Sequence, residues 1–419
     1  MGVHWSSAEV RNTCFYMASR LIANLGQELF NFSVSLFILS ITGSGTSFAL
    51  SLVIGTLPKL LFSVQAGILS DRFSRKAITI LMDISSGIVI LILLIYTNSL
   101  ENNILALYVA NFFIGAFGSV FNVAMNGAVP NLVNHDKLTE LNSWISILSS
   151  FTSIIAPLIG GLMYSNKNLS LFFLIGSICF FLAAFLESFI VYSFNVDSAR
   201  VKSINRSKMK DVILFLKANS NIAYIILLAC LLNFLLAFGY SVPMPFLVNN
   251  YLNMTSAQYG ILRSANTFGA LISASIMSVY PKQFTLDKRL IFGVFSISIV
   301  FILYGIIATP YVAVSAFTKF YIFLSLFFIF AFVLVLINIP LKVIMQKNIP
   351  NQLRGKSLGL MYTIMSAATP IGQIVAGVII DKIAPFALPI FAGLLLLFFT
   401  FFLKSAQNKF SITTKDDNQ

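Results

Sequence analysis

The segment Gly67-Ile-Leu-Ser-Asp71-Arg72-Phe-Ser-Arg75-Lys76 joins two apolar runs, 46–69 and 77–97. Each run reaches the ~20 apolar residues that a helix needs to cross a bilayer. Between the runs, a glycine permits a tight turn and the charged residues favour water. The segment therefore predicts a short loop at a membrane surface between two spanning helices.

The composition of the whole chain extends this pattern. Of 419 residues, 58% are hydrophobic and 10% are charged, and the mean hydropathy is +0.90. Soluble domains average about half apolar and about a quarter charged residues. The composition excludes a soluble protein, and the length accommodates twelve spanning helices, which need about 240 residues. We therefore expect an all-α polytopic membrane protein whose surroundings are the lipid bilayer.

Apolar runs bounded by Gly, Pro, Asn or charged residues predict the helices. The first six are expected near 14–41, 46–69, 77–97, 103–126, 141–163 and 169–192. The second six are expected near 221–242, 257–280, 290–309, 321–345, 357–380 and 385–403. The domains predicted from this division are a first half 1–194, a linker 195–220, a second half 221–403 and a tail 404–419.

The basic residues predict the orientation in the membrane. An even number of helices places both termini on one side, and 21 of the 27 Lys and Arg residues then fall in segments on that side. The outer loops hold Lys167, Lys319 and Lys382. Because cytoplasmic loops carry the excess of basic residues, we expect both termini in the cytoplasm and a multi-pass protein of the cell membrane. The net charge of +13 is then explained without nucleic acid as a partner.

Two short internal matches support a division into repeats. Pro130-Asn131 in "VPNLV" recurs as Pro350-Asn351 in "IPNQL", and "APLIGG" ending at Gly161 is echoed by "TPIGQ" around Pro370. Each match precedes or lies in the fifth helix of its half. Two six-helix repeats in parallel orientation are the arrangement expected of a rocking transporter.

The cysteines and histidines predict neither a disulfide framework nor a metal centre. Cys14, Cys179 and Cys230 lie in apolar stretches without CxxC spacing, and His4 and His135 are too few for a metal cluster. We expect no metal, no cofactor, a small-molecule substrate and a monomer.

The segment 67–76 resembles the loop signature of the major facilitator superfamily. Three other stretches resemble the macrolide-efflux-type drug exporters of that superfamily: "ITGSGTSFALSLVIGTLP" at 41–58, "VPNLVNHDKLTELNS" at 129–143 and "IPNQLRGKSLGLMYTIMSAATPIG" at 349–372. The resemblance spans almost the whole chain. It implies the major facilitator fold, alternating access to a central cavity, and export of small, often lipophilic molecules coupled to inward proton flow.

Two features depart from the pattern of these exporters. Many of the proton-coupled members carry an Arg in the fourth helix, whereas this chain has no charged residue between Asn103 and Asn126. The fifth helix has Ala156-Pro157-Leu-Ile-Gly160-Gly161 where the antiporter signature has Gly-Pro. Its Pro and Gly residues predict a bend or close packing, and ordinary helix packing explains them as well.

The first helix carries a polar face. Arg20, Asn24, Gln27, Glu28 and Asn31 recur at three- and four-residue steps in an otherwise apolar helix. A charge at bilayer depth costs at least ~2.5–3.5 kcal/mol, so Glu28 requires water or a partner. It lies about 14 residues from the inner end, or roughly 21 Å, close to the midplane.

Lys59, beside Pro58 in the second helix, lies at a similar depth, roughly 16 Å from the inner loop. One hypothesis is a titratable Glu28 whose ionisation depends on Lys59 and on substrate, as proton coupling requires. The alternative is a permanent ion pair that fixes the packing of the two helices. Asp83 and Glu187 lie near inner helix ends, where we expect water, loop cations and structural roles.

Other polar residues are candidates for the cavity. If the resemblance holds, the first, fourth, seventh and tenth helices line the path, and the last three of these carry Asn111, Asn233 and Asn338. Hydrogen bonds between helices explain these residues as well. Arg263, roughly 10 Å into its helix, is expected either at the interface or in the cavity.

By resemblance, Gly67, Asp71, Arg72 and Arg75 form a conformational latch, and the alternative is a solvated loop that enforces topology. Other functions remain open: uptake, or lipid or siderophore transport, by the same fold. A membrane enzyme would rest on His135-Asp136, which is more simply a capping or solvated pair. The chain lacks the GxxxxGK[ST] phosphate loop of a primary pump and any stretch that resembles a channel filter.

Overall fold

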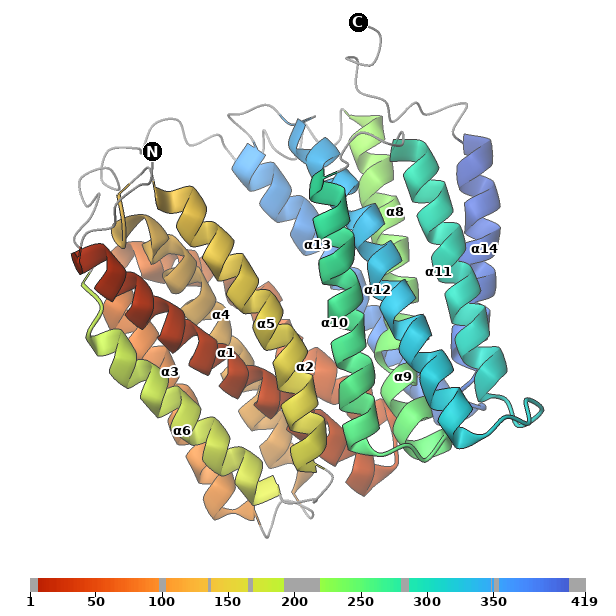
Figure 1. The fold of residues 1–419 in the computed structure, drawn as a ribbon, viewed down its shortest axis with the longest axis horizontal. Helices are drawn as coiled ribbons and strands as arrows, with labels where there is room; N and C mark the ends of the chain where they lie inside the picture. Colours follow the sequence, from red (N-terminus) through yellow and green to blue (C-terminus); the bar gives the residue numbers. More distant parts are fainter. Residues whose placement is uncertain are drawn as a thin grey trace, which may run out of the picture. The chain divides into compact units, whose positions relative to one another are not determined.

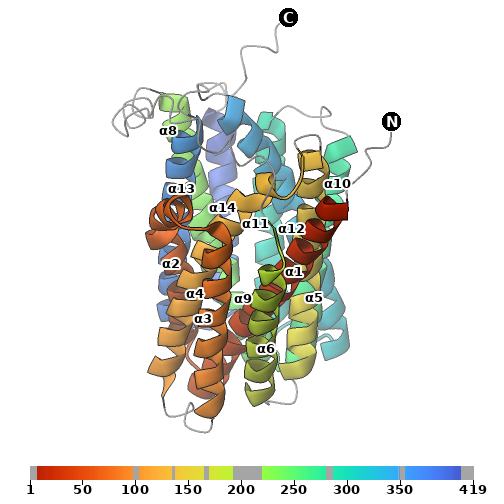
Figure 2. The same cartoon turned by 90° about the vertical axis from the view of Figure 1, so that its left-hand side faces the viewer.

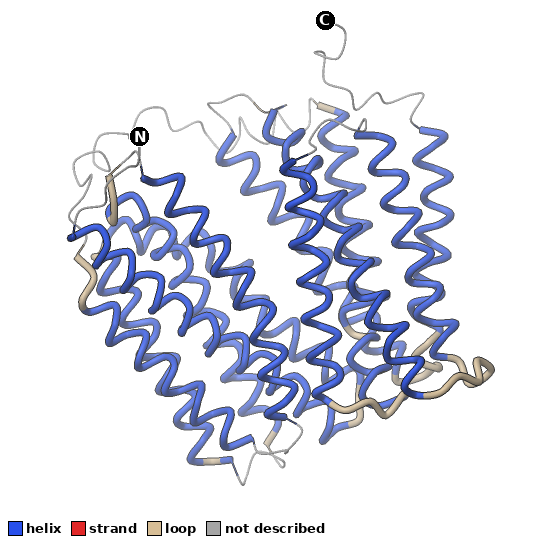
Figure 3. The backbone as a smooth tube through the Cα atoms, in the orientation of Figure 1, coloured by secondary structure: helices blue, strands red, loops and turns tan. Residues whose placement is uncertain are grey.

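The computed structural model describes residues 7–97, 103–134, 137–164, 169–191, 219–279, 286–347, 349 and 354–406. Within these ranges the chain consists of helices and connecting loops, without a strand (Figure 3). Ten of the described helices are long and apolar enough to cross a membrane. The expected all-α polytopic architecture is confirmed.

The chain forms two compact units. The first comprises Met1–Thr42 and Ser51–Ile204, and the second comprises Gly43–Leu50 and Asn205–Gln419. The helix α2 therefore begins in the second unit and continues in the first. The helices that lie wholly or mainly in the first unit are α1 (Ser7–Thr42), α2 (Gly45–Arg72), α3 (Arg75–Ile95), α4 (Ile104–Ala128), the short 3₁₀ turn η2 (Val129–Asn131), α5 (Leu138–Tyr164) and α6 (Leu169–Ser188) (Figure 1).

After residue 204, the second unit continues with an interrupted helix. Its described elements are α8 (Ser220–Leu236), η5 (Ala237–Ser241), α9 (Pro243–Pro245), η6 (Phe246–Tyr251), α10 (Ser256–Val279), α11 (Leu286–Ala308), α12 (Ala316–Lys347), α13 (Arg354–Ile380) and α14 (Ala387–Ala406). The expected end of the first of these helices, at 242, is wrong. Two prolines, which cannot donate backbone hydrogen bonds, are accommodated between the π-helical turns η5 and η6, so the helical path continues to Tyr251.

Three helix pairs recur in both units. In the first unit α3 packs against α4 and α6, and α1 packs against α5; Figure 2 shows these helices from the side. In the second unit the helices of the same order do the same: α11 packs against α12 and α14, and α8 packs against α13. This recurrence is the packing expected of two six-helix repeats.

The core of the first unit is aliphatic and aromatic. Phe30, Val34 and Ile38 of α1 are buried against Leu107 of α4 and Phe173 of α6. These side chains follow the i, i+4 spacing of one helix face. The apolar face of α1 is therefore in the core, which leaves its polar face for another surface.

Candidate functional site

A cavity of about 280 Å³ lies within the first unit. Of its 17 lining residues, 13 are polar or charged, three are glycines and one is leucine. They come from α1, α2, α4 and α5: Asn24, Gln27, Glu28, Asn31, Ser35, Ser51, Leu52, Gly55, Thr56, Lys59, Asn111, Gly115, Gly118, Asn122, Ser149, Thr152 and Ser153. Ligand pockets are mostly apolar and aromatic, so this lining is unusually hydrophilic.

The polar face of α1 supplies five of these residues. Asn24, Gln27, Glu28 and Asn31, expected on one face, all line the cavity together with Ser35. Arg20, expected on the same face, does not line it. Arg20 is buried, and its guanidinium donates to Tyr16 Oη at 2.6 Å and to Asn126 Oδ1 at 2.9 Å, so Arg20 joins α1 to the end of α4.

Glu28 and Lys59 line the same cavity, and both side chains are exposed. Among the described residues, neither makes an ion pair within 4 Å; the ion pair found there is Glu9–Lys137. The permanent Glu28–Lys59 pair, one of the two alternatives, is therefore absent from this geometry. The cavity instead contains one carboxylate and one ammonium group that make no ion pair with each other.

Several amides of the cavity are oriented by hydrogen bonds. Asn111 Nδ2 donates to the carbonyl of Ser51 at 2.6 Å, which joins α4 to α2. Gln27 Nε2 donates to Asn31 Oδ1 at 3.1 Å, and Asn122 Nδ2 donates to the carbonyl of Gly118 at 2.8 Å. Asn111 therefore forms a hydrogen bond between helices, as one of its two interpretations from the sequence predicted.

Two glycines bring α4 close to its neighbours. A Cβ atom at Gly115 would lie 2.5 Å from the carbonyl oxygen of Gly55 in α2, and one at Gly118 would lie 2.9 Å from Oε1 of Gln27 in α1. The wall of the cavity thus depends on residues without side chains.

The sequence reasoning missed ten polar or small residues of the cavity: Ser35, Ser51, Gly55, Thr56, Gly115, Gly118, Asn122, Ser149, Thr152 and Ser153. The signal that was available is the three- and four-residue spacing of small polar residues along α5 and α2. Such spacing is ambiguous, because Ser and Thr also bond to carbonyls of their own helix. Thr152 and Ser149 do this with Leu148 and Ile145, at 2.9 Å each.

Three candidates belong to the second unit and so are not part of this cavity. Asn233 donates to the carbonyl of Ala229 in its own helix at 2.8 Å. Arg263 and Asn338 have exposed side chains. Arg263 lies within electrostatic reach of Tyr240 and Tyr259.

The expected turn at Gly67 is wrong. The helix α2 continues to Arg72, and only Phe73 and Ser74 separate it from α3. A Cβ atom at Gly67 would meet open space, so no close approach requires this glycine. Helical hydrogen bonding continues through the polar residues because none of them is a helix breaker.

Two cations at the start of α3 bind the carbonyl ends of two helices. The guanidinium of Arg75 donates to the carbonyl of Gly127 and, at 2.9 Å, to Asn131 Oδ1. Lys76 Nζ donates to the carbonyls of Ser188 and Ile190 at 2.5 and 2.9 Å. Cations stabilise the C-terminal ends of helices, so Arg75 and Lys76 join α3 to α4 and α6.

Of the other latch candidates, Arg72 is exposed. The side chain of Asp71, the pair His135-Asp136 and the linker up to residue 218 lie outside the described residues. Their assigned roles stay predictions.

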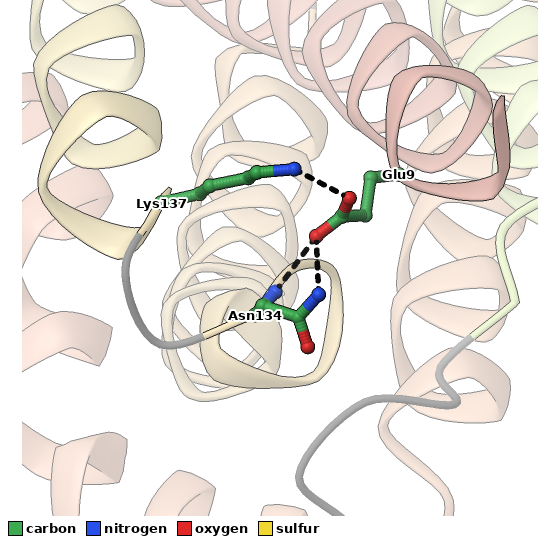
Figure 4. A network of polar contacts seen from close by, with 3 residues as sticks. All are labelled: Glu9, Asn134 and Lys137. Carbon is green, nitrogen blue, oxygen red and sulfur yellow. Dashed lines mark hydrogen bonds and ion pairs between the residues drawn. The ribbon is translucent and has the colours of Figure 1, made fainter. Parts of the chain in front are cut away.

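A buried ion pair joins the start of α1 to the segment before α5 (Figure 4). Glu9 Oε2 accepts from Lys137 Nζ at 2.7 Å, and Glu9 Oε1 accepts from the backbone amide and from Nδ2 of Asn134, both at 3.0 Å. The side chains of Lys137 and Glu9 are 5% and 1% exposed. No local pattern links residues so far apart in the chain.

The expectation of water around Asp83 and Glu187 is wrong. Their side chains are 2% and 0% exposed, because α3 and α6 pack directly against each other. Within the described residues, Asp83 Oδ2 and both carboxylate oxygens of Glu187 have no hydrogen-bond partner. Thr79, which faces Glu187, donates its hydroxyl proton to the carbonyl of Lys76 at 3.0 Å.

The motif of the fifth helix is buried. Ala156, Pro157, Gly160 and Gly161 all lie inside the unit. A Cβ atom at Gly160 would lie 2.9 Å from the ring of Phe32, so the motif brings α5 against α1.

The sequence profile of the Major Facilitator Superfamily matches residues 16–372. This chain belongs to the major facilitator superfamily. It is therefore a membrane transporter for small molecules and not an enzyme. Across the part of the transporter that the structure describes, no group of three or more His, Cys, Asp or Glu side chains gathers as a metal site.

The similar proteins described next align with most of this chain. The transporter YfiS of Bacillus subtilis, an uncharacterized MFS-type transporter, is 24% identical over 373 residues, which cover 88% of this chain and 86% of YfiS. Macrolide efflux protein A of Streptococcus pyogenes is 23% identical over 378 residues, covering 87% and 88%. A bacterial homologue of the iron transporter ferroportin in its inward-facing state has the same fold, with a TM-score of 0.72, 16% identity and coverage of 96% and 100%.

Proposed function

We propose that this transporter is a secondary exporter that expels small lipophilic molecules of the drug or macrolide type by alternating access, driven by protons that move into the cell. The cell membrane is its location, and both termini are cytoplasmic. The observation that carries the proposal is Glu28, which is exposed to a polar cavity and makes no ion pair within the described residues.

A coupling carboxylate must change protonation during the transport cycle. A carboxylate in a permanent ion pair resists this change, because the paired cation favours the ionised form. Glu28 meets the geometric requirement, since it reaches a cavity without such a pair. The amides of Asn24 and Asn31, on the same face of α1, supply hydrogen-bonding groups for substrate.

The direction of transport rests on similarity. Macrolide efflux protein A matches most of the chain, which favours export over uptake. The absence of a charged residue between Asn103 and Asn126 leaves Glu28 as the acidic candidate near the membrane midplane. The proposed coupling route through Glu28 takes the place of the fourth-helix Arg that the resemblance to proton-coupled exporters implies.

The experiment is export in proteoliposomes with and without an imposed pH gradient, using erythromycin and a chemically diverse panel of compounds. We expect the wild type to concentrate at least one compound only when the gradient is present. Glu28→Gln preserves the shape and removes the charge, so it should abolish uphill transport while downhill exchange continues. The control is Glu140→Gln, an exposed acidic residue outside the cavity. Gradient-driven accumulation by Glu28→Gln at the wild-type level would refute coupling through Glu28.

A further inference from the structure

The cavity presents two opposite charges that do not neutralise each other. Glu28 comes from α1 and Lys59 from α2, both side chains are exposed, and they lie beyond ion-pair distance of each other. A cationic ligand would be attracted by Glu28 but repelled by Lys59. An anionic ligand would be attracted by Lys59 but repelled by Glu28. A ligand with both charges satisfies both groups through charge-assisted hydrogen bonds.

We propose that the substrate presents a zwitterionic head group to this cavity, with its ammonium group at Glu28 and its carboxylate at Lys59. The proposal rests on the proposed function, since it assumes that the cavity binds substrate. It narrows the proposed substrate class from lipophilic molecules in general to amphipathic molecules that carry an amino-acid-like polar end.

The rest of the lining suits a polar end and not an apolar body. Leu52 is the one apolar side chain among the 17 described lining residues, and none of them is aromatic. Hydroxyl groups of Ser35 and Thr56 and the amide of Asn24 add neutral hydrogen-bonding partners. Binding an apolar body here would remove these groups from water without replacing their hydrogen bonds, which is unfavourable.

The size of the cavity supports the same conclusion. Pockets that enclose whole drug-sized ligands measure ~300–1,000 Å³, and this cavity measures about 280 Å³. It has room for a head group and not for a macrolide-sized molecule. The lipophilic remainder of the substrate would lie outside this cavity.

The test measures binding without any gradient, so that it is independent of transport. The purified full-length protein is titrated with γ-aminobutyrate, butylamine and butyrate, and the dissociation constants are obtained from the ligand-dependent melting temperature. These probes share one carbon chain and differ in charge. We expect γ-aminobutyrate to bind about tenfold more tightly than either singly charged probe, because each charged end adds a charge-assisted contact.

Two variants assign the charges to their residues. Glu28→Gln should remove the repulsion of butyrate and bring its affinity to that of γ-aminobutyrate. Lys59→Met should do the same for butylamine. The matched controls are Glu140→Gln and Lys382→Met, which change exposed charges outside the cavity and should leave the order of the three probes unchanged.

The spacing of the charges gives a second measurement. The series glycine, β-alanine, γ-aminobutyrate and aminocaproate should show one preferred length, because one ligand must reach both Glu28 and Lys59 with its two charged ends. A single preferred length that disappears in Glu28→Gln and in Lys59→Met would support the proposal.

Three results would overturn the zwitterion proposal: equal binding of butylamine and γ-aminobutyrate to the wild type, an unchanged order of probes in both variants, or no binding of any probe. Proton-driven export of a compound from the panel would survive any of them. Conversely, the wild type could prefer γ-aminobutyrate but show no gradient-driven export of any compound. That result would refute proton coupling and leave the zwitterionic site in place.

Discussion

The carboxylate of Asp381, just after α13, caps the first turn of α2 through Thr46. Its Oδ2 accepts from the backbone amide and the hydroxyl of Thr46 at 3.0 and 2.7 Å. Ser44 Oγ and the amide of Gly45 donate to the same carboxylate at 2.8 and 2.5 Å. A negative charge at a helix N-terminus accepts hydrogen bonds from the free backbone amides there and interacts favourably with the helix dipole. All four residues belong to the second unit.

This cap predicts a pH-dependent stability. Partial burial raises the pKa of Asp381, but the hydrogen bonds from Thr46, Ser44 and Gly45 outweigh it and the pKa lies below its ordinary value. A lowered pKa means that the stabilisation is present above the ordinary pKa of ~3.9 and is lost as the pH falls through the folded-state value. We expect Asp381→Asn to lower the melting temperature at neutral pH and to match the wild type in strong acid. Lys382→Met is the control, and a difference that persists in acid would contradict the assignment.

The two glycines of α4 should respond differently to a methyl group. Gly115→Ala would place its Cβ 2.5 Å from the backbone of Gly55, which cannot yield without moving α2, so we expect a loss of about 1–3 kcal/mol in stability. Gly118→Ala meets the end of the Gln27 side chain, which can rotate. It should preserve the melting temperature and change substrate affinity instead. Equal melting temperatures for both variants would contradict this distinction.

Replacing buried acidic residues should affect stability differently depending on whether their oxygens have hydrogen-bond partners. Asp83 and Glu187 have three oxygens without hydrogen-bond partners among the described residues, whereas both oxygens of Glu9 are bonded. The double variant Asp83→Asn, Glu187→Gln should not lower the melting temperature, because the amides keep nearly the same shape and these oxygens have, in the described part of the chain, no hydrogen-bond partners to lose. Glu9→Gln leaves Lys137 buried and should cost about 3 kcal/mol. A large loss in the double variant would indicate partners for its carboxylates.

The orientation is tested at Ser203 in the predicted cytoplasmic linker. After replacement of Cys14, Cys179 and Cys230, a single cysteine at this position should resist an impermeant thiol reagent added to intact cells and react after permeabilisation. A cysteine at Lys319, which lies in the first turn of α12 and is predicted to be on the outer side, is the positive control. Labelling of position 203 in intact cells would reverse the topology.

The latch hypothesis is tested with Asp71→Asn. If the loop controls exchange between inward- and outward-open states, the variant should insert and bind substrate normally but transport it more slowly. Binding is measured at equilibrium and transport in proteoliposomes at matched expression. Wild-type turnover, or equal losses of binding and transport, would favour the solvated-loop alternative.

Much of the secondary structure was predictable because its causes are local. A bilayer requires about 20 apolar residues per helix, and each helix satisfies its own backbone hydrogen bonds. The third helix, expected at 77–97, spans Arg75–Ile95, and the fourth, expected at 103–126, spans Ile104–Ala128. The polar face of α1 was likewise predictable, since spacing along one helix defines which residues share a face.

Relations between helices were not predictable from such spacing. Such relations depend on how neighbouring helices are rotated and offset. Examples are the hydrogen bond from Asn111 to Ser51, the separation of Glu28 from Lys59 and the long-range ion pair Glu9–Lys137. In lipid, apolar side chains gain little by leaving the tails for a neighbouring helix, so hydrophobicity does not select the contact face. Small residues and interhelical hydrogen bonds select it, and their partners lie on other segments of the chain. The polar residues of α1 were therefore visible in the sequence, whereas the cavity they share with α2, α4 and α5 is a property of the assembled unit.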